Sequence, residues 1–242
     1  MRKKPNAGKL LSVTLALALA AGGCGTTTQD APPGSTAGEA VTDTADNEVK
    51  NECPDGHESG GWTVGTEATV NSDYKLVWED EFEGDRLNMD DWNFEYHEPG
   101  WVNAELQEYV DSEKNTYVKD GKLYIQALKE IIDGKPYYTS GRINTQGKHD
   151  FQYGRFEARA KVPSGKGFLP AFWMMPTEEG YYGQWPKCGE IDIMEVHGSE
   201  LTTTYSTLHF GEPHTQEQSS YQIAAGEENF GEAFHVFACE WD

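Results

Sequence analysis

The feature that most constrains the fold is a series of short apolar runs that begins at Tyr74 and is broken by Gly, Pro, Asn and Asp. Across residues 156–162, apolar side chains alternate with charged ones, which is typical of a strand with one buried and one solvated face. Residues 168–175 are almost continuously apolar, which indicates a strand covered on both faces. Residues 123–127 and 234–241 are further strand candidates, and no long amphipathic helical pattern occurs in the sequence. The sequence therefore predicts an all-β sandwich.

The N-terminus has the pattern of an export signal. Basic residues at positions 2–4 and 9 precede an apolar run over residues 10–21, which is too short to span a bilayer. Small residues then lead into Cys24, an arrangement that resembles a bacterial lipobox, in which this cysteine is lipidated and becomes the mature N-terminus. We expect residues 1–24 to be a lipoprotein signal peptide, and the alternative is an ordinary signal peptide cleaved nearby. Both interpretations place the mature protein outside the cytoplasm, at the extracellular face of a bacterial membrane or secreted.

Composition divides the rest of the chain into two parts. Residues 25–72 are rich in Thr, Gly, Ala, Asp and Glu and poor in large apolar residues, so they cannot offset the entropy of ordering a core. We expect a flexible acidic tether there, followed by one folded domain over residues 73–242. The formal net charge of −22 argues against nucleic acid or an anionic membrane surface as partner. The expected membrane contact is the N-terminal lipid anchor only, and a monomer is expected.

The number and spacing of the cysteines and histidines argue against a disulfide-rich fold and a zinc site. Lipidation of Cys24 would leave three cysteines, an odd number without CxxC spacing, which excludes a dense disulfide framework. We expect no bridge between Cys188 and Cys239, because adjacent sheet faces would point their side chains apart. The seven histidines show no HxxxH pair, which argues against a zinc enzyme.

Three carboxylates fall within six residues of an otherwise apolar strand, Glu190-Ile-Asp-Ile-Met-Glu195. Glu190 and Asp192 share one face of a strand, whereas plain alternation would turn Glu195 into the core, where an unpaired carboxylate is very costly. A β-bulge near Met194 would return Glu195 to the face of the other two. The two glutamates would then lie roughly 13 Å apart between backbones. Side chains leaning together would reach the separation of about 5–5.5 Å that retaining glycosidases use.

Asp192 would lie between the two glutamates. A central carboxyl can share a proton with one neighbour and keep the outer two in different protonation states, as double displacement requires. The alternative is three solvated charges on an exposed strand face. The nearby rings of Trp173 and Trp185, which suit stacking on sugars, make that alternative less attractive.

The carboxylate motif and its surroundings resemble glycoside hydrolase family 16, in the bulged, laminarinase-like (endo-β-1,3-glucanase) form rather than the unbulged lichenase form. The resemblance spans residues 74–242 and follows the order of the family's segments. The segments that carry it, besides the carboxylate strand, are Val77-Trp-Glu-Asp-Glu-Phe82, Asn103-Ala-Glu-Leu-Gln-Glu-Tyr109, Ser140-Gly-Arg-Ile143, Tyr153-Gly-Arg-Phe-Glu-Ala158, Pro170-Ala-Phe-Trp-Met174, Trp185-Pro186, Phe234-His235 and Glu240-Trp241.

The resemblance implies a β-jelly roll of two bent antiparallel sheets, of which the concave one forms an open substrate cleft. It implies that Glu190 is the nucleophile, Glu195 the general acid/base and Asp192 an assisting carboxylate. It also implies five substrate-binding residues, of which two stack on sugar rings (Trp173 and Trp185) and three hydrogen-bond hydroxyl groups (Asn103, Arg142 and His209). No cofactor is required by this chemistry, although family members often hold a structural calcium ion on the convex side.

The matching part of the chain is shorter than the roughly 200–250 residues of an all-β domain of this kind, so we expect a truncated catalytic domain without its last strands. The expected substrate is a polysaccharide, a β-1,3 or mixed β-1,3/1,4 glucan cleaved at internal bonds. Two alternatives stay open: the same fold acting on agar or carrageenan, and a non-catalytic jelly roll that binds glycans at the cell surface. Sulfated substrates would favour a basic cleft, and a binding module would be expected to lack one of the two glutamates. The acidic chain with both glutamates favours a hydrolase of neutral glucan.

Overall fold

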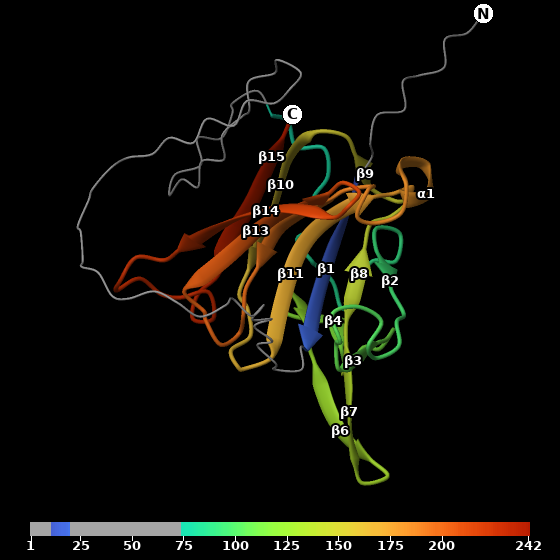
Figure 1. The fold of residues 1–242 in the computed structure, drawn as a ribbon. Coiled ribbons are helices and arrows are strands. Elements are labelled where there is room, and N and C mark those ends of the chain that lie inside the picture. Colours follow the sequence, from blue (N-terminus) through green and yellow to red (C-terminus); the bar gives the residue numbers. More distant parts are fainter. Residues whose placement is uncertain (1–10, 20–73) are drawn as a thin grey trace, which may run out of the picture. The chain divides into compact units, whose positions relative to one another are not determined.

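The computed structural model describes Leu11–Leu19 and residues 74–242 (Figure 1). Strands dominate these residues, and their α-helix, α1 (Glu179–Tyr182), is a single short turn. The strands are β1 (Leu11–Leu19), β2 (Asn93–Phe94), β3 (Gln107–Tyr109), β4 (Thr116–Val118), β5 (Leu123–Ile125), β6 (Leu128–Ile132), β7 (Lys135–Ser140), β8 (Arg142–Asn144), β9 (Asp150–Phe151), β10 (Gly154–Ala160), β11 (Phe168–Pro176), β12 (Glu190–Glu195), β13 (Thr203–Phe210), β14 (Thr215–Gln222) and β15 (His235–Trp241). Within the described ranges, no helix is long and apolar enough to cross a membrane.

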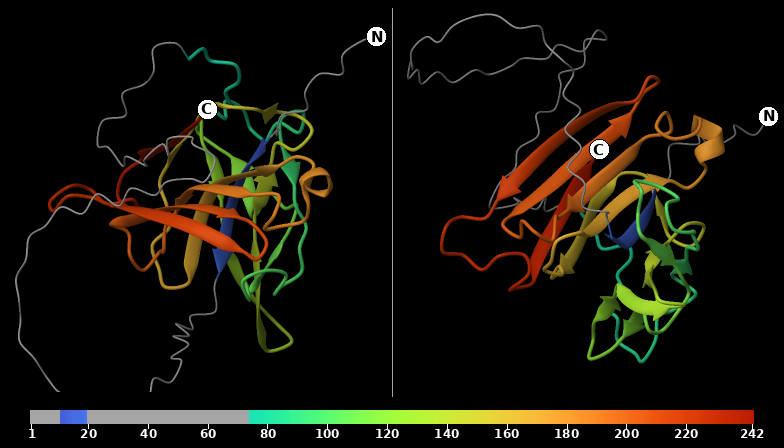
Figure 2. Two further views of the ribbon diagram at one scale, coloured as in Figure 1. Left: turned by 45° about the horizontal axis from the view of Figure 1, so that its top comes forward. Right: turned by 60° about the horizontal axis from the view of Figure 1, so that its bottom comes forward.

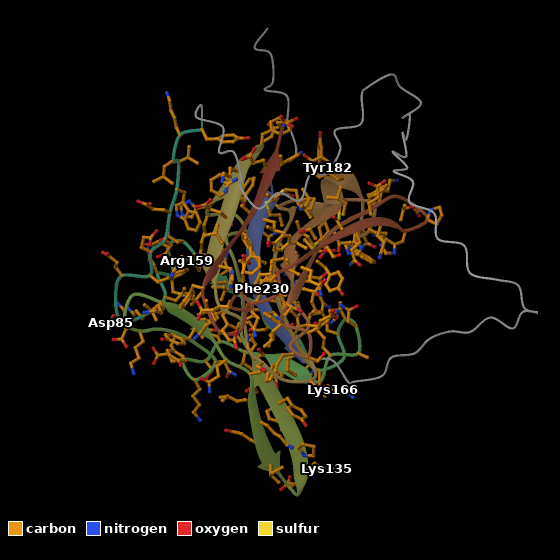
Figure 3. The ribbon with its side chains drawn as sticks, turned by 90° about the vertical axis from the view of Figure 1, so that its left-hand side faces the viewer. Asp85, Lys135, Arg159, Lys166, Tyr182 and Phe230 are labelled. Atoms are coloured by element: carbon orange, nitrogen blue, oxygen red, sulfur yellow. The ribbon has the colours of Figure 1, made fainter. Side chains whose placement is uncertain are left out.

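The large sheet of the described chain has the strand order β14-β13-β12-β11-β1-β8-β2, with β9 added beside β1. Its neighbouring strands pair antiparallel, and the right-hand view of Figure 2 shows β11 to β14 running side by side. Strand β12, which carries the three carboxylates, lies between β11 and β13. Smaller sheets pair β10 with β15, β4 with β5, and β3 with the β6–β7 hairpin, whose tip is marked by Lys135 in Figure 3.

The main core cluster lies between the large sheet and the β10–β15 pair, and a second, smaller cluster forms around Trp92 and Ile143. Phe172 of β11 and Met194 of β12 pack in one buried cluster with Phe156 of β10 and Phe237 of β15. Phe230, labelled at the centre of Figure 3, belongs to the same cluster. Because both sheets contribute buried side chains to one cluster, they face each other as the two layers of a sandwich. The core therefore supports β12 from behind and fixes the backbone on which the carboxylates stand.

The strand predictions are confirmed where they rest on burial patterns. In β10, Phe156, Ala158 and Ala160 are turned inward relative to the exposed Glu157 and Arg159. In β11, the consecutive residues 172–174 are all buried, so both faces of this strand are covered. The all-β jelly-roll prediction is also confirmed. No disulfide joins Cys188 to Cys239 in the described residues.

The apolar run near the N-terminus contributes β1 to the large sheet. Leu11–Leu19 pairs along its whole length with Phe168–Pro176 of β11, and its other edge pairs with β8 and β9. The strand thus bridges β11 and β8. The export function of this run stays a prediction. Cleavage before Cys24 would remove β1, so β1 belongs to the uncleaved chain alone. The loss of C-terminal strands also stays a prediction. The predicted lipid site at Cys24 and the tether at 25–72 lie outside the described residues.

Candidate active site

An irregularity in β12 brings the three carboxylates together. Asp192 pairs with Thr207 of β13 and Glu195 pairs with Tyr205, so β12 advances three residues while its partner advances two. A matching shift occurs against β11. Ile193 and Met194 are consequently both buried in the core cluster, which plain alternation would forbid. This is the predicted β-bulge, and it frees Glu195 from the core face.

The protonation of the carboxyl groups follows from this crowding. Asp192 is 5% exposed, and burial together with the negative charges of Glu190 and Glu195 raises its pKa to about 9. Its proton is donated to Glu190 in a side-chain hydrogen bond. Burial, and then the charge of Glu190, also raises the pKa of Glu195. Near neutral pH the cluster therefore holds a protonated Asp192 between its two glutamates.

Two of the predicted substrate-binding residues lie directly beside this cluster. Trp185 donates its indole N–H to Glu190 Oε2 at 2.5 Å and leaves 45% of its surface exposed. His209 of β13 pairs with Glu190 across the sheet, and its Nε2 lies 3.1 Å from Asp192 Oδ2. Burial lowers the pKa of His209, with a further contribution from His214, against the opposing charge of Glu190. The His209–Asp192 contact is therefore a hydrogen bond between neutral groups near pH 7 rather than an ion pair.

Arg142 of β8 lies among aromatic rings. Its guanidinium carbon is 4.6 Å from the ring centroid of Trp173, 5.0 Å from Trp101 and 5.7 Å from Tyr109. Its Nε donates to Glu95 Oε2 at 2.7 Å. The structure thus places Arg142 and Trp173 together, with only 9% and 7% of their surfaces exposed. Their substrate-binding roles stay predictions.

Glu95 anchors this second group of residues. Asn144 donates to Glu95 Oε1 at 2.7 Å, and His97 Nε2 lies 3.0 Å from Oε2. Burial disfavours the charge on Glu95, but Arg142 and these hydrogen bonds outweigh it and lower the pKa of Glu95. The ring of His97 stacks on exposed Trp101 with centroids 3.5 Å apart, so Glu95 positions an aromatic surface as well as the arginine.

The remaining candidate, Asn103, lies exposed in the loop between β2 and β3 with a φ of 50°. In the described part of the chain no contact joins it to the carboxylates, so its substrate role stays a prediction. Sequence reasoning missed Glu95, His97, Trp101 and His214. The spacing of Glu95 and His97, two residues apart directly after β2, was the signal that could have indicated a shared face.

The described residues contain no cluster of three His, Cys, Asp or Glu arranged to hold a metal ion. The calcium site stays a prediction. The side chains gathered at β12 are its own carboxyl groups, the partly exposed indole of Trp185 and the neutral imidazole of His209. This set can transfer protons and offer a carboxylate to an electrophilic carbon.

Comparison with known proteins extends this description. Residues 102–242 match the model of the family described as glycosyl hydrolases family 16. The chain is 41% identical over 184 residues to glucan endo-1,3-beta-glucosidase A1 of Niallia circulans, covering 69% of this chain and 27% of that protein. It is 40% identical over 179 residues to the beta-glucanase of Rhodothermus marinus, covering 69% of this chain and 59% of the relative.

A solved structure shares the fold. The laminarinase catalytic domain of Thermotoga maritima superposes with a TM-score of 0.63 at 40% identity, covering 69% of this chain and 70% of that one. The chain thus spans about a quarter to three-fifths of the length of the two curated relatives named above. Since the family match covers more than half of the chain and includes the carboxylate strand, the chain belongs to glycosyl hydrolases family 16.

Proposed function

We propose that this protein is a retaining endo-glycosidase that cleaves β-1,3 or mixed β-1,3/1,4 glucan by double displacement. The observation that carries the proposal is the bulge in β12, which places Glu195 within electrostatic reach of Glu190 and Asp192. The named relatives, a glucan endo-1,3-beta-glucosidase and a beta-glucanase, support the choice of substrate.

The two glutamates would divide the reaction between them. Glu190 attacks the anomeric carbon while Glu195, whose raised pKa favours the protonated form, gives its proton to the leaving glycosidic oxygen. The C–O bond to the leaving sugar breaks, and an ester bond to Glu190 forms. Glu195, now a carboxylate, then removes a proton from water, and that water displaces Glu190 with net retention of configuration.

Asp192 and Trp185 would control the nucleophile. Both donate hydrogen bonds to Glu190, the first from a protonated carboxyl and the second from its indole nitrogen. These donors favour the charged carboxylate that attacks, and they hold its orientation. When the ester forms, the same donors remain hydrogen-bonded to the carboxyl group of Glu190, which then carries no charge. The two donors therefore stabilise Glu190 both as the attacking carboxylate and as the carboxylate that leaves when water displaces it.

Chemical rescue tests the two roles. In Glu195→Ala with 4-nitrophenyl β-laminaribioside, the activated leaving group departs without an acid, and the glycosyl ester accumulates. Azide then attacks the ester from the side normally taken by water, so we expect faster turnover and a β-glycosyl azide. An α-glycosyl azide would reverse the roles of Glu190 and Glu195. Glu217→Ala, a change on exposed β14, is the control and should show neither slowing nor rescue.

Substrate choice separates the proposal from its alternatives. Product analysis on β-1,3-glucan, mixed-linkage glucan and agarose should give soluble oligosaccharides from the first two. Cleavage of agarose alone would instead support another polysaccharide as substrate. Retention of β-1,3-glucan on an affinity gel without any product would support a glycan-binding jelly roll. Glu190→Gln is the matched variant, because it should keep the affinity of the native protein and lose turnover.

We further propose that the enzyme works at the extracellular face of a bacterial membrane, held by a lipid on Cys24. The support is the charged, apolar and small-residue order of residues 1–24. Metabolic labelling with a fatty-acid analogue tests the anchor. Label should appear in the membrane-bound native protein and be lost in Cys24→Ser. Labelled Cys24→Ser would contradict the assignment.

A further inference from the structure

A second histidine continues the row of hydrogen-bonding groups that begins at the carboxylates. His209 is the next-to-last residue of β13, and His214 directly precedes β14 in the turn between these strands. Gly211, with a φ of 82°, lets the chain reverse there. The reversal brings His214 Nε2 to 3.0 Å from His209 Nδ1, with the two rings nearly parallel. The row therefore runs from Glu190 through Asp192 and His209 to His214.

The proton on Asp192 determines which ring nitrogens of His209 and His214 act as donors. Asp192 gives its proton to Glu190, so its Oδ2, facing His209, serves as an acceptor. A neutral His209 carries one proton, and Asp192 requires it on Nε2. His209 Nδ1 is then an acceptor, and the group that faces it is His214 Nε2. The only consistent arrangement of the row therefore has His214 donating to His209 and His209 donating to Asp192.

We propose that His214 is a positioning residue that fixes the Nε2–H tautomer of His209 and, through it, directs the proton of Asp192 toward Glu190. The proposal rests on the function proposed above. Without the donor at His214, His209 can take its proton on Nδ1 and turn an unprotonated Nε2 to Asp192. Asp192 would then donate to His209 instead of Glu190. The nucleophile would lose a hydrogen bond that it needs in its charged form.

The neighbours of the row do not supply an alternative donor. Trp185 packs beside both histidines, with ring centroids 5.9 Å from His209 and 4.9 Å from His214, but its N–H is committed to Glu190. Lys187, on the loop before β12, and Glu212, in the β13–β14 turn, form an ion pair with each other at 3.7 Å. On the side of β12, Asp192 contacts His209 and the charge of Glu190 acts on it.

Two substitutions separate positioning from packing. His214→Phe keeps a ring against Trp185 but removes the N–H, whereas His214→Gln can present an amide N–H near the same place. Since one hydrogen bond between neutral groups contributes roughly 0.5–1.5 kcal/mol, we expect His214→Phe to lower kcat by about 3- to 10-fold with little change in KM. The acidic limb of the pH profile of kcat/KM should move to higher pH. His214→Gln should recover kcat to within about twofold of the native protein.

Nitrogen-15 NMR of the histidine rings tests the tautomer without any turnover. Native His209 should show a protonated Nε2 and an unprotonated Nδ1 near pH 7, and His214→Phe should add the other tautomer. A native His209 protonated on Nδ1 would overturn the proposal, even if glucan cleavage is established. Unchanged kcat and pH profile in His214→Phe would also overturn it, and an increase in KM alone would indicate a sugar contact instead. If the native protein cleaves no glucan, the NMR result still decides the tautomer by itself.

Discussion

As the pH rises, the native protein should lose stability that Asp192→Asn keeps. In the folded protein the pKa of Asp192 is about 9, raised by burial and by Glu190 and Glu195, against an unperturbed value of 3.8. Between these values the folded state keeps a proton that the unfolded state releases. The stability contributed by this proton is complete below pH 3.8 and is lost as the pH rises through 9. The loss is about 1.4 kcal/mol per pH unit.

From pH 5 to pH 7 the native protein should therefore lose up to about 3 kcal/mol that Asp192→Asn does not lose. Asparagine is nearly isosteric with a protonated aspartate, and it can still donate to Glu190 and accept from His209, so packing should be preserved. Urea unfolding at pH 5, 6 and 7 measures the difference. Asp90→Asn, at an exposed position, is the control and should follow the native protein. Parallel stability curves for native protein and Asp192→Asn would refute the argument that burial and crowding hold Asp192 neutral.

Two further predictions concern the core and a tight contact. Phe237 is 6% exposed within the main cluster, so Phe237→Ala should lower the free energy of unfolding, measured in urea, by about 3–5 kcal/mol. The neighbouring Val236 is 56% exposed, so Val236→Ala should change it by less than about 0.5 kcal/mol. Equal effects would contradict the two-layer packing. Gly141→Ala should lower the melting temperature, because the new Cβ would lie 2.0 Å from Thr116 Oγ1 and overpacking costs about 1–3 kcal/mol. Gly180→Ala is the control, because its Cβ would meet open space and should leave the melting temperature unchanged. A folded Gly141→Ala with native stability would show that this contact relaxes freely.

The strands that could be predicted from the sequence are those in which burial imposes a pattern on the apolar residues. The alternation in β10 and the continuous apolar run of β11 follow from packing against the same core. The bulge in β12 was predictable for a related reason, since an unbroken strand would have buried Glu195 without a partner. Its existence follows from the cost of the alternative, and the register of β12 against β11 and β13 confirms it.

Features set by tertiary contacts leave no such pattern. Strand β14 is polar and mostly exposed, so its side chains carry no apolar period, and its register is fixed by the hairpin with β13. Glu95 reaches Arg142 from 47 residues away, through a strand pairing of β2 with β8 that local sequence does not specify. His214 becomes part of the site only because the turn after β13 folds back. These residues could be identified only after the strands were placed in space.

The measurement that tests the proposed mechanism most directly is the anomeric configuration of the first product. Proton NMR of β-1,3-glucan during the first minutes of cleavage by the full-length protein distinguishes a newly formed β reducing end from an α one, before mutarotation mixes them. The anomeric carbon is inverted twice, first by attack of Glu190 and then by attack of water activated by Glu195, so the β anomer should appear first. An α anomer appearing first would show a single displacement by water and would contradict the assignment of Glu190 as nucleophile.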